Sequence, residues 1–208
     1  MSKKATAQFW DTAHRYLGHQ LKVIRQVSSH TIDSYRDCLN SFIDYLERVE
    51  NISRKKISFH NFGKETIKRY QTWMITEQGL APKTCNLRLT AIRSFLEYAA
   101  QEYLWLMPVY TDACTIAGVK TPNHAIEYFE PDEMTALLAA PSGTSRTDRR
   151  NQMMLIFLYD TAARVAEARQ VKVSDLHLDA GVPYVTLLGK GRKYRNIPLM
   201  EKTVLHLK

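Results

Sequence analysis

Residues 161–167 read Thr-Ala-Ala-Arg-Val-Ala-Glu and decide how the second half of this 208-residue sequence is interpreted. They follow a strongly apolar segment, 149–162, that predicts a buried helix, and 165–170 predicts a short helix directly after it. Arg164 would lead the short helix, where its planar guanidinium could bind a phosphate. Glu167 shares the same helical face and could orient it. The alternative is an ordinary surface ion pair between Arg164 and Glu167. Without further evidence, this alternative is the better explanation of the pair.

A second basic stretch follows, at 189–195, and reads Gly-Lys-Gly-Arg-Lys-Tyr-Arg. Its first five residues lie between 182–188 and 194–199, two β-branched and apolar segments that predict a β-hairpin. Lys190, between two glycines, can approach a nucleic acid backbone closely. The stretch is not a Walker phosphate loop, because the first glycine, the spacing and the following Ser or Thr are absent. The alternative is an ordinary basic turn. The occurrence of this stretch together with the Arg164 segment is a specific arrangement, which weakens that alternative.

The first half of the sequence predicts four helices of a compact module. Apolar residues at helical spacing and capping residues predict helices over about 7–19, from Ser29 or Thr31, over about 64–78 and from Pro82. Gly79 stands where a helix would end in a left-handed cap. Residues 105–125 lose the helical period and contain prolines and a glycine, which is typical of a linker. A further helix is expected to begin near Glu130.

The charge of the chain favours a polyanionic partner. Lys and Arg total 29 against 21 Asp and Glu, a net charge of +8. Residues 1–120 hold most of this excess, with 17 basic and 11 acidic side chains. Each phosphate that a basic residue neutralises releases a condensed counterion, so such a surplus suits a nucleic acid. The alternative is a protein that merely has a high isoelectric point.

Composition also bounds the class of protein and its compartment. No apolar run approaches the ~18–20 residues that span a bilayer. The basic start is not followed by an apolar signal core, so we expect a cytoplasmic protein without a membrane partner. Three cysteines, Cys38, Cys85 and Cys114, lack CxxC spacing, which argues against a disulfide framework or a zinc site. We therefore expect free thiols, no bound metal and no cofactor.

Taken together, these segments resemble the tyrosine recombinase (phage integrase) family over residues 9–208. Residues 31–35, Thr-Ile-Asp-Ser-Tyr, and 84–95, Thr-Cys-Asn-Leu-Arg-Leu-Thr-Ala-Ile-Arg-Ser-Phe, look like the family's second and fourth core-binding helices. The Arg164 segment and the Gly189–Leu199 hairpin look like its catalytic arginine and lysine segments. The resemblance implies a mainly α fold: a SAM-like four-helix core-binding domain at 1–107 and a linker at 108–125. Residues 126–208 would then be the first part of an α+β integrase catalytic domain with a β-hairpin.

The resemblance also implies roles for individual residues. Arg164 would hold the scissile phosphate, Glu167 would brace the site, and Lys190 would act as general acid toward the leaving 5′ oxygen. Fixed cations stabilise the charge that develops on the non-bridging oxygens in phosphoryl transfer, which agrees with these roles and requires no metal. In the complete family member the reaction passes through a covalent 3′-phosphotyrosyl link.

Several polar residues are candidates for DNA contacts, since helices present such side chains to phosphates and groove edges. They are Thr31, Arg36, Lys83, Asn86, Arg88, Thr90, Arg93, Arg192 and Lys193. Solvated surface faces are the alternative for these positions. By the resemblance the partner is double-stranded DNA, with self-association or association with a full-length recombinase on that DNA.

The sequence departs from the family pattern in two places. Ala162 stands where family members usually carry glycine, a departure that looks mild. The family's His-x-x-Arg motif and nucleophilic tyrosine have no counterpart before Lys208, and residues 200–208 read as the opening of another helix. We therefore expect a chain that ends inside a domain and binds DNA without cutting it unaided.

Two other function classes stay open from the sequence. One is a non-catalytic DNA-binding module that occupies recombination sites and modulates a full-length recombinase. The other is a helical interaction protein without a nucleic acid partner, in which the positive charge is incidental.

Overall fold

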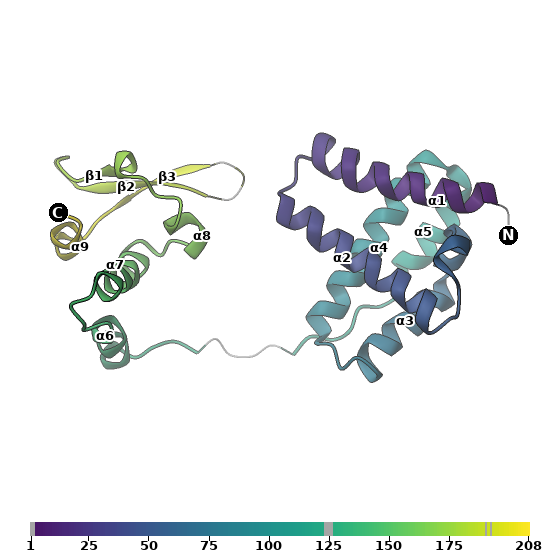
Figure 1. Cartoon of the computed structure of the whole chain (residues 1–208), viewed down its shortest axis with the longest axis horizontal. Helices are drawn as coiled ribbons and strands as arrows, with labels where there is room; N and C mark the ends of the chain where they lie inside the picture. The colour runs from purple at the N-terminus through teal and green to yellow at the C-terminus, as the bar shows by residue number, and fades with distance from the viewer. Residues whose placement is uncertain (1–2, 123–126, 190, 192) are drawn as a thin grey trace. The chain divides into compact units, whose positions relative to one another are not determined.

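A computed structural model describes residues 3–122, 127–189, 191 and 193–208 (Figure 1). The chain forms two compact units, a first unit of residues 1–124 and a second unit of residues 125–208. Among the described residues, no helix has the length and apolar character needed to cross a membrane. Lys190 and Arg192, both predicted site residues, lie outside the described residues.

The first unit is helical. Its elements are α1 (Lys3–Arg15), the π-helix η1 (Tyr16–Ile24), α2 (Ser29–Arg48), the 3-10 helices η2 (Arg54–Lys56) and η3 (Phe59–Phe62), α3 (Lys64–Thr76), α4 (Pro82–Glu102), the 3-10 helix η4 (Leu104–Leu106) and α5 (Met107–Cys114). Local signals place the main helices. Ser28 caps α2 by accepting a hydrogen bond from the Thr31 amide, and Gly79 has a φ of +59° after α3. Pro82 opens α4, as its fixed φ favours.

An aromatic cluster forms the core of the first unit. Phe95 of α4 is fully buried, and its ring lies 5.8 Å from Phe9 of α1 and 5.5 Å from Tyr16 of η1, between ring centroids. Phe59 and Phe62 of η3 contact the same ring at 5.8 and 6.0 Å. Because four elements meet at one side chain, their packing depends on the volume that Phe95 fills.

Two helical segments of the first unit differ from the sequence-based expectation. The first helix begins at Lys3 and continues past Arg15 as the nine-residue π-helix η1, instead of covering 7–19. Residues 107–114, expected to be part of a linker, form α5. Side chains of α4 hold this helix and the chain after it: Arg93 donates to the carbonyl oxygens of Ala113 and Ile116. Such tertiary hydrogen bonds leave no periodic pattern in the sequence.

The second unit combines helices with a small sheet. Its elements are α6 (Pro131–Ala139), α7 (Arg146–Thr161), α8 (Val165–Ala168), the 3-10 helix η5 (Val173–Asp175), β1 (Leu176–His177), β2 (Tyr184–Leu188), β3 (Tyr194–Pro198) and α9 (Glu201–Leu207). The strands are antiparallel in the order β1-β2-β3, and β2 and β3 form the predicted hairpin. The two-residue strand β1 is too short to be found from sequence alternation.

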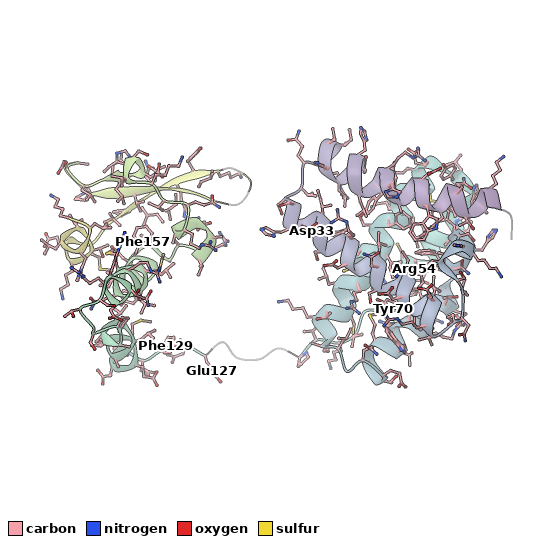
Figure 2. The ribbon with its side chains drawn as sticks, in the orientation of Figure 1. Asp33, Arg54, Tyr70, Glu127, Phe129 and Phe157 are labelled. Carbon is pink, nitrogen blue, oxygen red and sulfur yellow. The ribbon has the colours of Figure 1, made fainter. Side chains whose placement is uncertain are left out.

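A small apolar core holds the second unit together. Phe157 of α7 is 6% exposed and packs with Val185 and Leu187 of β2, which are 0% and 1% exposed. Figure 2 shows the Phe157 side chain between α7 and the sheet. Ala168 of α8 and Leu199 after β3 complete this buried cluster, which is much smaller than that of the first unit. The mainly helical class with a β-hairpin is thus confirmed.

Replacing Phe95 tests the aromatic core of the first unit. We expect Phe95→Ala to lower the free energy of unfolding by about 3–5 kcal/mol, because it leaves a cavity where four elements meet. Urea titration followed by tryptophan fluorescence measures this, since Trp10, Trp73 and Trp105 all lie in the first unit. Leu104→Ala is the control, because Leu104 is 78% exposed. Equal stability of the two variants would contradict the prediction.

Candidate functional site

The turn between α7 and α8 presents Arg164. Ala162 ends α7 with a φ of 47° and ψ of 31°, in the left-handed region that favours glycine. The hydroxyl of Thr161 donates to the Phe157 carbonyl at 2.6 Å and accepts a bond from the Ala163 amide at 3.3 Å. Arg164 is extended and is the N-cap residue directly before α8, and its side chain is 69% exposed. The departure at Ala162 is therefore not mild: the alanine occupies a strained conformation directly before the site.

A single carboxylate, that of Glu167, connects the residues of the site. Its Oε1 accepts hydrogen bonds from Nη1 of Arg164 at 2.8 Å and from Nη1 of Arg195 at 3.3 Å. Its Oε2 accepts bonds from Nη2 of Arg195 at 2.7 Å and from the Arg164 backbone amide at 2.9 Å. The Glu167 side chain is only 6% exposed. We call Arg164, Glu167 and Arg195 the arginine–glutamate cluster.

The hydrogen bonds to Glu167 keep it ionised. The Arg164 backbone amide and the Arg195 guanidinium lower the pKa of Glu167 from its usual 4.5 to about 2, against the opposing effect of burial. Two guanidinium groups therefore share one carboxylate, and the cluster carries one positive charge in excess. Because Arg164 remains largely exposed while Glu167 fixes one edge of its guanidinium, Arg164 can also receive an anion from solvent.

The hairpin end lies against the same cluster. The amide of Gly189 donates to the Lys193 carbonyl at 2.8 Å and closes the end of the β2–β3 ladder. A Cβ atom at Gly189 would lie 3.2 Å from Nη1 of Arg195 and 3.5 Å from Oε1 of Glu167. A side chain at position 189 would therefore be tightly packed against the Arg195 guanidinium, and glycine avoids this contact. Lys190, the predicted general acid, follows Gly189 in sequence, and Lys193 is exposed.

The predicted DNA-contacting residues of the first unit lie on α2 and α4. On α2, the Thr31 hydroxyl bonds to that of Ser28 at 2.9 Å, and Arg36 pairs with Asp33 at 2.5 Å. On α4, Lys83 and Thr90 are exposed, whereas Arg88 is half-buried. Burial raises the pKa of Cys38 on α2 and of Tyr70 on α3, and the charge of Arg88 partly opposes both increases. Arg88 therefore lies at the junction of three helices.

Two of the predicted contacts on α4 already have partners in the protein. Asn86 exchanges two 2.8 Å hydrogen bonds with the backbone of Val119, and Arg93 donates to one carbonyl at the end of α5 and one after it. Both side chains fasten residues 113–119 to α4, which is a structural role. Their contact with DNA stays a prediction.

Sequence reasoning missed Arg195 as a member of the site. Its partner Glu167 lies 28 positions earlier in the chain, so no helical spacing connects them. The alternation of the strand contains the signal: Arg195 and Ile197 share one face of β3, and Ile197 belongs to the core side. A charged residue on the core side of a strand needs a buried partner of opposite charge.

In the described part of the chain, three or more His, Cys, Asp or Glu side chains do not gather into a potential metal site.

Two family models match the chain. Residues 14–103 match the phage integrase N-terminal SAM-like domain, and residues 127–208 match the phage integrase family. The chain belongs to the tyrosine recombinase (phage integrase) family. The first of these matches confirms that the helical first unit has the predicted SAM-like fold.

Individual relatives agree with this family. The chain is 36% identical over 184 residues to the tyrosine recombinase XerD of Halalkalibacterium halodurans, covering 87% of the chain and 57% of that protein. The chain is also similar to the XerH site-specific recombinase in a crystal structure with difH substrate, with a TM-score of 0.61 and 19% identity. This match covers 88% of the chain and 52% of the XerH chain. A second match is a lambda integrase tetramer bound to a Holliday junction, with a TM-score of 0.64 and 15% identity. It covers 92% of the chain and 52% of the lambda integrase chain. The chain thus spans a little over half the length of the relatives it matches.

Replacing the strained alanine tests the turn before Arg164. We expect Ala162→Gly to stabilise the second unit by about 1 kcal/mol, because glycine adopts the left-handed conformation without the Cβ clash. Ala166→Gly, at an exposed helical position of α8, should instead destabilise it by about 0.5–1 kcal/mol. Urea titration followed by the amide NMR signals of β2 measures both changes. Destabilisation by both substitutions would contradict the strain at Ala162.

The low pKa of Glu167 predicts how the second unit responds to acid. Since the folded-state pKa of about 2 lies below the usual 4.5, ionised Glu167 stabilises the fold above pH 4.5, and this contribution is lost as the pH falls toward 2. Glu167→Gln should therefore be less stable than the native chain at pH 7, with a difference that shrinks across this window. Denaturant midpoints of the second unit at a series of pH values measure it. Glu127→Gln, at an exposed position, should follow the native profile.

Proposed function

We propose that this chain takes part in site-specific DNA recombination and binds a phosphodiester of duplex DNA at the arginine–glutamate cluster. One observation carries the proposal: the Arg164 guanidinium is 69% exposed and yet is held by a carboxylate that is 6% exposed. A surface ion pair between two solvated side chains would not be held in this way. A cation that is fixed before its ligand arrives binds a phosphate without first losing side-chain freedom.

The relatives support the proposed class of reaction. The XerH structure contains a recombinase bound to its substrate DNA after cleavage, and the lambda integrase structure contains a tetramer on a Holliday junction. By analogy with these proteins we propose that the chain binds double-stranded DNA and associates there with copies of itself or with a longer recombinase. We further propose that the first unit acts as a core-binding domain that includes α5, and that the second unit carries the chemistry.

The roles within the cluster follow from phosphoryl-transfer chemistry. Arg164 would contact the non-bridging oxygens of the phosphodiester, where negative charge accumulates. Lys190 would donate a proton to the leaving 5′ oxygen, on which negative charge develops as its bond to phosphorus breaks. Glu167 would orient Arg164 without touching the DNA. Arg192 and Lys193 would contact the DNA backbone beside the hairpin.

The first unit would add contacts that position the duplex. Thr31 and Arg36 at the start of α2, and Lys83, Arg88 and Thr90 along α4, supply hydroxyl and cationic donors of the kind that bind phosphate oxygens. Such contacts fix orientation and carry little sequence information. Tyr16, Tyr45 and Tyr70 are buried in the aromatic core and Tyr184 stacks on His177, so we propose none of these four as a nucleophile.

Substitution of Arg164 tests the proposed phosphate contact. We expect Arg164→Ala to weaken binding of a fluorescently labelled DNA duplex about tenfold and to reduce the salt slope of log K by about one, as loss of one phosphate contact does. Fluorescence anisotropy from about 50 to about 200 mM salt measures both quantities. The matched control is Arg169→Ala, which removes an exposed guanidinium from the other end of α8.

Two results would contradict the proposal. Native binding that is absent, or flat with salt, would favour a protein without a nucleic acid partner. Equal losses in Arg164→Ala and Arg169→Ala would reduce the cluster to general positive charge. A protein–DNA complex that survives denaturation in detergent would instead indicate a covalent link and would show that this chain contains a nucleophile.

A further inference from the structure

Arg195 is a charged residue on the apolar side of the hairpin. In the β2–β3 register Leu187 faces Arg195, and Val185 faces Ile197. Directly opposed residues of an antiparallel pair lie on the same side of the sheet. Leu187 is 1% exposed and Val185 is 0% exposed, so this side faces the core of the second unit. A guanidinium at that place is stable only with a partner of opposite charge.

Glu167 supplies this partner and divides its oxygens between two arginines. Arg195 reaches both carboxylate oxygens, at 2.7 and 3.3 Å, through its two terminal nitrogens. Arg164 reaches one oxygen with its side chain and the other with its backbone amide. The exposed fraction rises from 6% for Glu167 through 39% for Arg195 to 69% for Arg164. The three side chains therefore form a series that leads from the core to the solvent.

We propose that Arg195 is a positioning residue of the phosphate site: it holds the Glu167 carboxylate, and through that carboxylate it fixes the Arg164 guanidinium relative to the hairpin end that precedes Lys190. This inference rests on the proposed function, because it assigns the phosphate contact to Arg164. Arg195 itself directs both terminal nitrogens to Glu167, and it is less exposed than Arg164. It therefore acts through Glu167 and not as a second anion contact.

The packing of Gly189 supports this assignment. The Gly189 backbone lies so close that an added Cβ would stand 3.2 Å from Nη1 of Arg195. The same Cβ would stand 3.5 Å from Oε1 of Glu167. The hairpin end therefore lies beside the Arg195 fork and the Glu167 carboxylate, with little space for a side chain at position 189.

The loss of Arg195 has a definite electrostatic consequence. The cluster then contains one guanidinium and one carboxylate, so its excess positive charge disappears. Glu167 stays buried and depends on Arg164 alone for a cation. Because a buried carboxylate takes the strongest available donor, Arg164 should turn toward Glu167 and become a poorer anion ligand.

The first arm of the test follows Glu167 without DNA. In the full chain, NMR titration of the Glu167 carboxyl carbon should give a pKa near 2 for the native protein and a clearly higher pKa for Arg195→Gln. Arg195→Lys should fall between the two, because lysine keeps the charge but lacks the two-point fork. Arg169→Gln, which removes an exposed charge, should match the native protein. A Glu167 titration unaffected by Arg195→Gln or Arg195→Lys would overturn the proposal.

The second arm is a double-mutant cycle on affinity for the labelled duplex. We expect Arg195→Gln alone to weaken binding about fivefold, and to cause no further loss in the Arg164→Ala background, since coupled residues deviate from additivity. Multiplicative losses in the double variant would overturn the positioning role, because they would mean that Arg195 contacts DNA independently of Arg164.

The two arms separate the two possible failures. If Arg164→Ala leaves DNA affinity unchanged while Glu167 responds to Arg195→Gln, the proposed phosphate site is wrong and the hold of Arg195 on Glu167 stands. If Arg164→Ala weakens binding while Glu167 ignores Arg195, the proposed function stands and the positioning role is wrong. If Arg195→Gln does not fold, the Glu167 titration in Arg195→Lys still tests the proposal, because this variant retains the charge at position 195.

Discussion

The second unit depends on one buried carboxylate that accepts four hydrogen bonds. Glu167 lies in a four-residue helix, which could not hold its shape alone, and it joins that helix to a strand nearly thirty positions later. A buried ion pair is stable only when the polar atoms of the carboxylate are satisfied, and here each oxygen accepts two donors. The place of Arg164 at the protein surface follows from this connection.

The two units achieve stability in different ways. The first unit packs many aromatic rings into a continuous core, so its helices are held by non-directional burial. Among the described residues of the second unit, the buried apolar side chains are Phe157, Ala168, Val185, Leu187 and Leu199. Directional contacts such as those of Glu167 therefore have more weight there. This difference agrees with a second unit that holds exposed charged side chains on a small core.

Local signals made much of the fold predictable, and contacts between distant residues made the rest unpredictable. The signals at Gly79 and Pro82 act within a few residues, so these helix ends could be placed from the sequence. The cap of α2 is Ser28, one residue before the Ser29 that the sequence suggested. The pair Arg164–Glu167 was accessible for the same reason, since three positions separate the two side chains. In contrast, α5 depends on Arg93 and the cluster depends on Arg195, whose partners lie 20 or more positions away. The π-helical register of η1 also has no simple pattern in sequence.

The left-handed alanine before Arg164 has a consequence for experiments on this protein. Its strain is confined to one residue whose side chain is a single methyl group, so removing that methyl leaves the neighbouring donors and acceptors in place. The substitution Ala162→Gly would therefore give a more stable second unit. In that variant, destabilising substitutions of the nearby charged residues can be made while the second unit stays folded. Substitutions that are inaccessible in the natural chain would become measurable in that background.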